Sequence, residues 1–136
     1  MSFLDGFEPI KRIKGVASMS VSKDGVSFTT AVIEKMGKPR YVTPLIDRNT
    51  QRFAIVSSDT ETDDTRLFYK EGRKSQYGIR WSDRDIRSTL GEMMGWNLEE
   101  SGYRVAGFFD YDDNAFIFDL KEAKPYGKGA AKGEED

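Results

Sequence analysis

The feature that most constrains the fold of this chain is a short pattern that occurs twice. Residues 25–29 (GVSFT) and 78–82 (GIRWS) both run from a glycine through an apolar, a polar and an aromatic residue to a hydroxyl residue. A second pair of segments, 45–55 (LID to FAI) and 108–118 (FFD to FIF), matches across turns of equal length. A chain that repeats its elements in one order is expected to form two similar units.

Each unit is predicted to hold two strands, a helix and two further strands. Alternating apolar and polar residues, with turn residues between them, place the strands at 16–22, 26–28, 41–46, 52–56, 66–69, 78–81, 103–110 and 115–120. A short helix is expected at 31–36, capped by Thr29 or Thr30. A longer helix is expected to begin at the capping box of Ser82 and Asp85 and to end at Gly95.

These elements predict an α+β protein of two tandem β-β-α-β-β units. A unit of about 40 residues cannot bury its sheet face alone, so the two units are expected to pack together as a pseudo-dimer. The expected organisation is a basic first unit, a polar linker, an acidic second unit and a disordered tail, at 1–57, 58–65, 66–120 and 121–136.

The order of strand, glycine turn, strand, helix and hairpin resembles the swapped-hairpin module of the AbrB/SpoVT family of DNA-binding transition-state regulators and antitoxins. Residues 21–28, 34–37 and 85–91 carry the resemblance, and the tandem arrangement looks like the MraZ branch. The resemblance implies a swapped-hairpin-like pseudo-dimer and a role in transcription regulation. The family's helix usually opens with proline, whereas Thr30 and Asp83 stand at those positions here.

The two units differ in charge. The chain carries a net charge of -2, but residues 1–57 hold nine Lys and Arg against five Asp and Glu, whereas 58–120 hold eight against fourteen. A basic surface is the usual electrostatic footprint of a DNA-binding protein. We therefore predict that duplex DNA is contacted by the cations near the first hairpin and the end of the first helix: Lys11, Arg12, Lys14, Lys23, Lys35, Lys38 and Arg40.

Two alternatives to DNA binding remain open, because lysine and arginine are also the ordinary exterior of a soluble domain. The first is a protein-interaction module, or a phage or mobile-element accessory module, that does not bind nucleic acid and uses its acidic unit to bind a basic partner. The second is a small hydrolase using carboxylates such as Asp110, Asp112 and Asp113, although these residues favour a turn.

Missing residue types exclude several functions. With no histidine and no cysteine, the chain has no His-dependent triad, zinc-thiolate site, disulfide or cysteine nucleophile. We expect no enzymatic activity, cofactor or metal, and a cytoplasmic homo-oligomer, since no signal peptide or membrane span is recognisable. Core positions are expected for four large side chains around the second helix: Trp81, Met93, Met94 and Trp96.

Overall fold

The structure is a computed structural model that describes residues 4–9, 15–70 and 78–126. Over these residues the chain is an α+β protein: one mostly antiparallel sheet with two α-helices. The strands are β1 (Ser18–Ser22), β2 (Gly25–Phe28), β3 (Tyr41–Asp47), β4 (Arg52–Ser58), β5 (Arg66–Leu67), β6 (Ile79–Trp81), β7 (Gly102–Asp110), β8 (Ala115–Asp119) and β9 (Lys124–Tyr126). The helices are α1 (Thr30–Lys35), α2 (Arg84–Met94) and the short 3₁₀ helix η1 (Leu120–Glu122).

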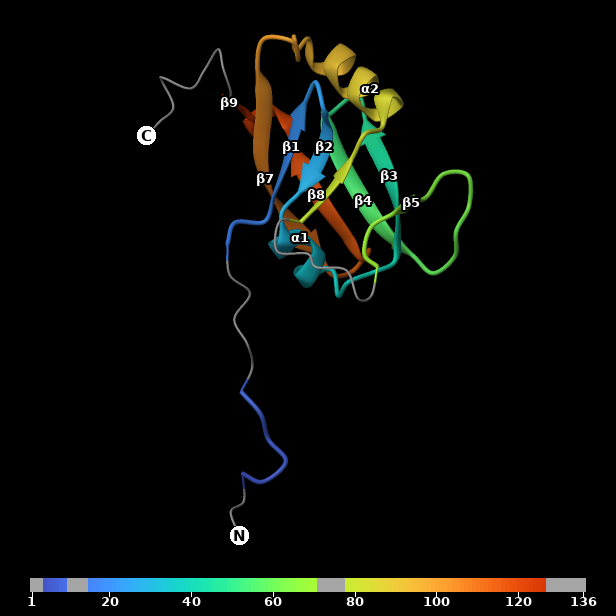
Figure 1. The fold of residues 1–136 in the computed structure, drawn as a ribbon, viewed down its shortest axis with the longest axis vertical. Helices are drawn as coiled ribbons and strands as arrows, with labels where there is room; N and C mark the ends of the chain where they lie inside the picture. The colour runs from blue at the N-terminus through green and yellow to red at the C-terminus, as the bar shows by residue number, and fades with distance from the viewer. Residues whose placement is uncertain (1–3, 10–14, 71–77, 127–136) are drawn as a thin grey trace.

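The sheet curls around a single core, with strand order β5-β3-β4-β8-β7-β1-β2-β6 and with β9 added to β7. We call β9, β1, β2, β6 and the first half of β7 the front wall, which faces the viewer in Figure 1. The back wall comprises β5, β3, β4, β8 and the second half of β7. The two helices lie at opposite ends of this curled sheet, α2 at the top and α1 at the bottom of Figure 1.

Side chains that alternate along the strands of both walls fill the core. Phe28 of the front wall lies 6.4 Å from Phe53 and 5.9 Å from Phe118 of the back wall, measured between ring centroids. All three rings are almost completely buried, and a fully buried phenylalanine contributes roughly 2 kcal/mol through the hydrophobic effect. The period-two pattern of the sequence therefore determines which side of each strand faces inward.

Side chains, rather than ladder hydrogen bonds, bridge the seam between β5 and β6. The Trp81 indole Nε1 donates to the Leu67 carbonyl oxygen at 2.9 Å, and the Trp81 ring packs edge-on against Phe28 at 4.9 Å. The prediction that Trp81 is a core residue is confirmed. Met93, Met94 and Trp96 lie at the margin of the core and are only partly buried.

Strands from the two halves of the chain pair with each other in symmetric registers. On the front wall, Ser27 pairs with Arg80, and the flanking pairs join Val26 to Trp81 and Phe28 to Ile79. The repeat matches Val26 with Ile79 and Phe28 with Trp81, so equivalent residues lie at equivalent distances from the central Ser27–Arg80 pair.

The back wall has the same kind of symmetry, centred on the pairing of Ala54 with Ile117 in β4 and β8. The two repeat glycines are also equivalent, because both have positive φ and both approach the other half's backbone. A Cβ at Gly25 would overlap the Trp81 carbonyl oxygen, and one at Gly78 would overlap the Phe28 carbonyl oxygen. Each half therefore contributes strands to both walls.

The N-cap of α1 is Thr29, one of the two predicted residues, although its side chain makes no capping hydrogen bond. The N-cap of α2 is Asp83 and not Ser82, so the predicted capping box is wrong. Asp83 Oδ1 accepts from the Ile86 backbone N–H at 3.1 Å, while Oδ2 accepts from Arg66 Nε, and serine cannot offer both contacts. The predicted end of α2 at Gly95 is confirmed, with a left-handed φ of 71°. In the described ranges no helix is long and apolar enough to cross a bilayer.

The tail prediction is wrong for its first residues. The disordered tail was expected from Lys121, but η1 and β9 order the chain as far as Tyr126. Lys121 Nζ donates to the Thr50 carbonyl oxygen at 2.6 Å, and β9 pairs with residues 102–104 of β7. Main-chain pairing with a sheet edge does not require the apolar pattern on which the prediction depended. The remainder of the tail, 127–136, lies outside the described residues.

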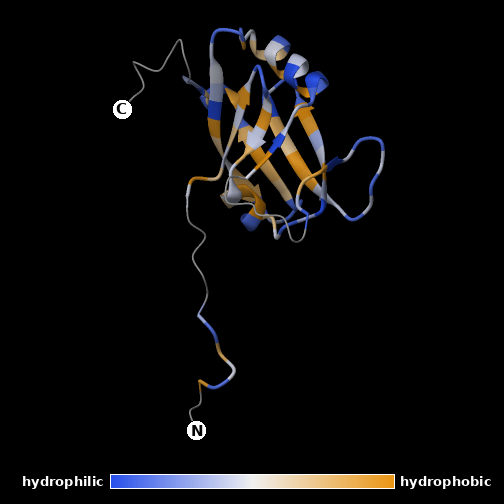
Figure 2. Cartoon of the chain, viewed as in Figure 1, coloured by the Kyte–Doolittle hydropathy of each residue, from blue (hydrophilic) through white to orange (hydrophobic). Residues whose placement is uncertain are grey.

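The polar linker begins later than expected. Ser58, its first predicted residue, is the last residue of β4 and pairs with Tyr41. From residue 59 to 65 the chain forms an exposed excursion that is hydrophilic along its length (Figure 2). Hydrogen bonds from hydroxyl groups stabilise this excursion. For example, Ser58 Oγ donates to the Thr60 carbonyl oxygen at 2.8 Å.

Candidate nucleic-acid interface

The cations predicted to contact DNA fall into separate places. Lys11, Arg12 and Lys14 lie outside the described residues. Lys23 lies in the β1–β2 turn beside α2, and its carbonyl oxygen accepts from Arg87 Nη1 at 2.6 Å. Lys35 is the last residue of α1, and Lys38 and Arg40 follow that helix, at the opposite end of the curled sheet (Figure 1). The structure therefore does not bring Lys23 together with Lys35, Lys38 and Arg40.

Aromatic rings hold two of the cations that follow α1. The Lys38 ammonium lies 5.7 Å from the centre of the Tyr69 ring. Arg40 Nε donates to the Tyr41 hydroxyl at 3.2 Å, and that hydroxyl donates in turn to the Glu61 carboxylate at 3.3 Å. The hydrogen bond to Tyr41 raises the pKa of the Arg40 guanidinium. Arg40 thus stays charged, but it shares Tyr41 with an acidic side chain.

A different set of cations lies in one row across the front wall. Successive register partners on five strands, β9, β7, β1, β2 and β6, are Lys124, Arg104, Ser20, Ser27 and Arg80. Their sequence neighbours Met19, Val26 and Val105 are buried, so this row, which we call the front row, faces outward. The three cations are exposed, and the two serines between them are half-buried. The row therefore offers short hydroxyl side chains flanked by positive charge.

Two neighbours fix the position of Arg104 within this row. Its Nε donates to Ser20 Oγ at 3.2 Å, and its guanidinium lies 4.5 Å from the centre of the Tyr126 ring. Gly102 makes room for that ring, since a Cβ there would lie 2.6 Å from the nearest Tyr126 ring carbon. The other N–H groups of Arg104 bond to no described residue. A guanidinium oriented in this way can form two parallel hydrogen bonds to a phosphate.

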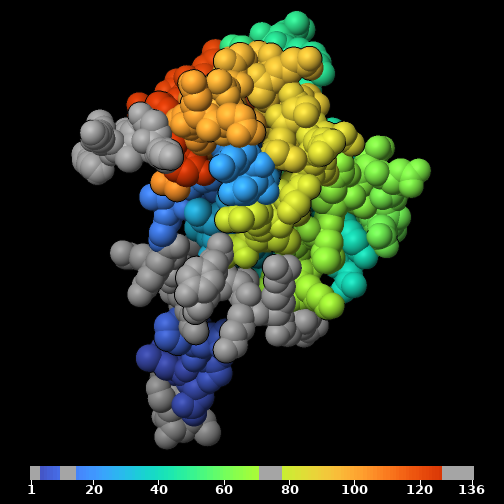
Figure 3. Space-filling model, turned by 45° about the horizontal axis from the view of Figure 1, so that its top comes forward, coloured from blue at the N-terminus to red at the C-terminus, as the bar shows by residue number. Residues whose placement is uncertain are grey.

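A hollow of about 910 Å³ opens on the same face. Its lining includes the hydroxyl residues Ser18, Ser20, Ser27 and Thr29, with Arg104 and Lys124 on one side. One carboxylate, that of Glu122, also lines it. Figure 3 shows the β1–β2 hairpin in blue between β9 in red on one side and α2 with β6 in yellow on the other. Hydroxyl groups and cations around a shallow hollow can donate hydrogen bonds to an anion.

The front-row cations are not neutralised by carboxylates in the described part of the chain. The ion pairs found there are Arg66 with Asp83 at 2.5 Å and Lys121 with Asp119 at 2.8 Å. Burial opposes the ionisation of Asp83, but its hydrogen bonds from Arg66 and the Ile86 N–H outweigh that effect and lower its pKa. Arg66 therefore serves to join the two walls through its ion pair with Asp83.

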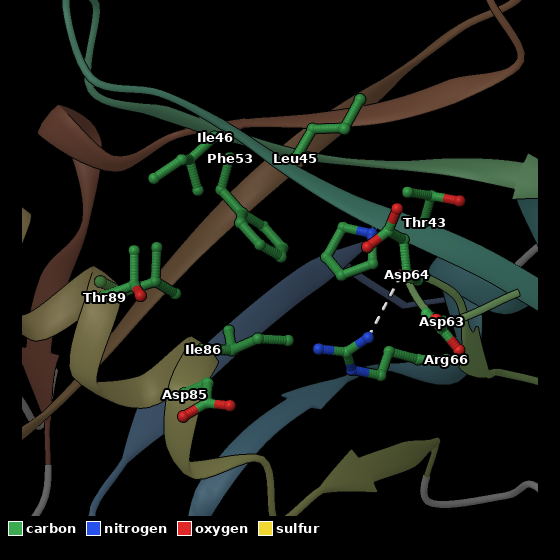
Figure 4. Close-up of a pocket in the computed structure, with 12 residues that line it drawn as sticks. Thr43, Leu45, Ile46, Phe53, Asp63, Asp64, Arg66, Asp85, Ile86 and Thr89 are labelled. Carbon is green, nitrogen blue, oxygen red and sulfur yellow. Dashed lines mark hydrogen bonds between the residues drawn. The ribbon is translucent and has the colours of Figure 1, made fainter.

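A second hollow, of about 430 Å³, lies between β3, α2 and the excursion 59–65 (Figure 4). Its base is apolar, with Phe53, Ile86 and Leu90, whereas Asp63, Asp64 and Asp85 lie around its mouth. Arg66 crosses it and donates through Nη1 to the Asp64 carbonyl oxygen at 3.2 Å. Acidic residues of the linker and of α2 thus lie around an apolar depression.

The carboxylates considered for hydrolysis lie in the turn between β7 and β8. Asp110 Oδ1 accepts from the Asp112 backbone N–H at 3.1 Å, which is the hydrogen bond of an Asx turn. The nearby charge of Asp110 raises the pKa of the exposed Asp113 carboxyl. Among the described residues there is no group of three or more acidic side chains placed to hold a metal ion.

Sequence reasoning missed Arg80, Arg104 and Lys124 because they belong to the acidic unit and the tail. The repeat contained a usable signal, since it matches Arg80 with Ser27 and symmetric units place such residues opposite each other. Comparison with family models, curated proteins and solved structures yields no match to this chain. The resemblance to the AbrB/SpoVT family accordingly stays a prediction based on the residues quoted above.

Proposed function

We propose that this protein is a cytoplasmic, non-enzymatic regulator that binds duplex DNA through the front row. The observation that carries the proposal is the alignment of Lys124, Arg104, Ser20, Ser27 and Arg80 across five strands. Arginine, lysine and serine side chains are the groups that most often contact phosphate oxygens. The exposure of the three cations, none of which has an ion-pair partner among the described residues, supports the assignment.

The dimensions of the front row suit a duplex. Arg104 and Arg80 are separated by three strand spacings, which corresponds to about 14 Å. The major groove of B-DNA is about 12 Å wide, so the two guanidinium groups can meet phosphates on opposite sides of one groove. Ser20 and Ser27 lie between the two arginines, and their short side chains let the DNA backbone approach the sheet closely.

The proposal includes a tandem origin for the fold. The two β-β-α-β-β units form a swapped-hairpin-like pseudo-dimer, as in the AbrB-like regulators that the sequence resembles. The symmetric registers about Ser27–Arg80 and Ala54–Ile117 support it, as does the equivalent placement of Gly25 and Gly78. In this arrangement the front row lies across the pseudo-dyad.

The test is fluorescence anisotropy with a random-sequence duplex, titrated over a range of salt concentrations. Each phosphate contact contributes a slope of about -0.9 to the logarithm of affinity against the logarithm of salt concentration. Arg80→Ala is expected to make the slope shallower by about 1, while Arg48→Ala, the same charge change in the β3–β4 turn, alters it less. Equal changes in both variants, or no binding at low salt, would rule out the front row.

A second function is favoured by the hollow in Figure 4. An apolar base surrounded by Asp63, Asp64 and Asp85 suits a basic side chain with an aliphatic stem, as in a lysine-rich protein partner. If this function is correct, Asp63→Asn with Asp64→Asn weakens binding of an oligolysine peptide, whereas Asp112→Asn with Asp113→Asn leaves it unchanged. Isothermal titration calorimetry measures the peptide affinity of both double variants. An unchanged affinity in the Asp63→Asn, Asp64→Asn variant contradicts this function.

A further inference from the structure

The outer face of the back wall carries an apolar row. Leu45, Ala54, Ile117 and Phe108 are successive register partners on β3, β4, β8 and β7, and we call them the back row. Leu45 and Phe108 are 50% and 57% exposed. Packing within the protein does not account for large apolar side chains that face solvent at both ends of one row.

The back row has a raised and a lowered part. Ala54 lies between the larger Leu45 and Ile117, and a hollow of about 300 Å³ opens there. Arg52 and Asp47 border the hollow on the side toward the β3–β4 turn. Ile117, on the adjacent strand, stands beside this depression. The surface therefore presents one apolar projection and one apolar depression on neighbouring strands.

Polar residues flank the back row on both sides. Two positions along the strands in one direction, Arg52 on β4 pairs with Asp119 on β8. In the other direction, Thr43 and Asp110 lie on the outer strands of the next row. Arg52 and Asp119 carry opposite charges on adjacent strands, so a face packed against this one matches these charges only at particular registers.

We propose that the back row is a dimer interface that packs against the same row of a second copy of this chain. The two-fold axis lies between the two packed faces. It is parallel to the strands and passes over the gap between β4 and β8. With this axis, Ile117 enters the hollow over the partner's Ala54, and Phe108 covers the partner's Leu45. Both contacts occur twice, as an isologous interface requires.

Charge complementarity favours a second copy as the occupant and this axis as its position. Arg52 faces the partner's Asp119, a carboxylate that Lys121 of its own chain also contacts, and the Thr43 hydroxyl faces the partner's Asp110. Moving the axis by half a strand spacing onto β8 would instead place Asp119 against the partner's Asp119. Packing of two sheets with their mean strand directions within about 30° of each other is the common aligned arrangement.

The size of the back row sets the expected strength of the dimer. Four strands span about 14 Å, so the back row with its flanking residues covers an area well below the roughly 800 Å² per partner of a standard interface. We therefore expect a dimer that dissociates on dilution within the micromolar range. In this dimer the two front rows point away from each other, so one dimer presents two opposite front faces.

The test is sedimentation velocity of the full chain from low micromolar to near-millimolar concentration, without nucleic acid. Phe108→Ser is expected to raise the dissociation constant of the dimer at least about tenfold, since it removes a large apolar side chain at the interface. Ala54→Leu fills the hollow and is expected to weaken the dimer also, although it makes the surface more apolar. Val16→Ser, which removes an exposed apolar side chain on the front face, is the matched control.

The Ala54→Leu variant separates specific docking from general adhesion. If the dimer forms by non-specific contact between apolar surfaces, Ala54→Leu strengthens it, and the proposed axis is wrong. A wild-type protein that remains monomeric at all concentrations overturns the proposal entirely. Circular dichroism melting of each variant checks that a loss of association does not come from unfolding. None of these outcomes depends on whether the front row binds DNA.

Discussion

The front row and the back row lie on opposite outer faces of the same curled sheet, yet they share no residue type. The front row is three exposed cations around two serines, whereas the back row is entirely apolar. On their inner sides the two walls are alike, with Phe28 and Val26 facing Phe53 and Phe118. Core packing therefore constrains the inner positions in the same way and leaves the outer positions to be determined by what each face contacts.

This difference shows that exposure alone does not explain an outer surface. Large apolar residues at exposed positions add little to stability, because their area stays in contact with water. Cations in a row repel one another in the absence of an anion. Both rows thus contain arrangements that the isolated fold does not need, and for each row we have proposed a partner of matching chemistry.

The largest expected effect comes from breaking the register that builds the front wall. In Gly78→Ala the new Cβ would overlap the Phe28 carbonyl oxygen at a position with a φ of 80°. Combined steric overlap and left-handed strain should lower the free energy of unfolding by about 3 kcal/mol or more. Urea denaturation followed by tryptophan fluorescence measures the loss.

Gly37→Ala is the control for that substitution. Its φ is 81°, but a Cβ there meets no atom within 4 Å, so only the backbone strain remains. The expected loss is about 1 kcal/mol. Equal losses in the two variants would mean that the close approach between β2 and β6 does not matter for the front wall.

A smaller effect is expected at the seam where the two walls meet. Asp83→Asn keeps an acceptor for the Ile86 N–H but removes the charge that pairs with Arg66. The free energy of unfolding should fall by about 1.5 kcal/mol at pH 7. Because the folded-state pKa of Asp83 is lowered, this stabilisation is present above about pH 4 and is lost as the pH falls through the folded-state pKa.

Chemical denaturation of wild type and Asp83→Asn at several pH values tests the charge contribution. The difference between the two proteins should shrink as the solution is acidified. Asp85→Asn, the same change two residues further along α2, should cost less because Asp85 has no ion pair in the described structure. A wild-type advantage that persists unchanged in acid would show that the charge of Asp83 is not responsible.

The smallest effects are expected from the outer rows themselves. Arg80→Ala and Phe108→Ser should each change the free energy of unfolding of the monomer by about 0.5 kcal/mol or less, because both side chains are exposed. Thermal melting at a concentration below dimer formation measures this. A loss several times larger in either variant would mean that the row supports the fold and would weaken the comparison between the two faces.

Much of the local structure follows from the sequence. The strands, both helices and the end of α2 at Gly95 lie within a few residues of their expected places, because alternation and left-handed glycines are local signals. The cap of α2 was misplaced by one residue, since Asp83 also accepts from Arg66, which lies 17 positions earlier in the chain. The order of 121–126 was missed because it depends on pairing with β7.

The candidate site was harder to predict from the sequence than the local structure was. The sequence grouped Lys23 with Lys35, Lys38 and Arg40 because they are close in the first unit. In the structure Lys23 lies beside α2, whereas the other three lie at or just after the end of α1, at the opposite end of the curled sheet. The row that contains Arg104 and Lys124 draws on segments in which acidic residues balance or outnumber the cations. A count of charges along the chain does not detect such a row, because its members come from different strands.

By itself the sequence determined the repeat, the order of the elements and the residues that face the core, because each depends on neighbours a few positions apart. Only the tertiary structure decided that Ser20, Arg104 and Lys124 are adjacent, and that Ala54 lies beside Ile117. The physical reason is that strand register joins residues far apart in the chain. A strand's own pattern specifies which side is inward, but not which strands become its neighbours.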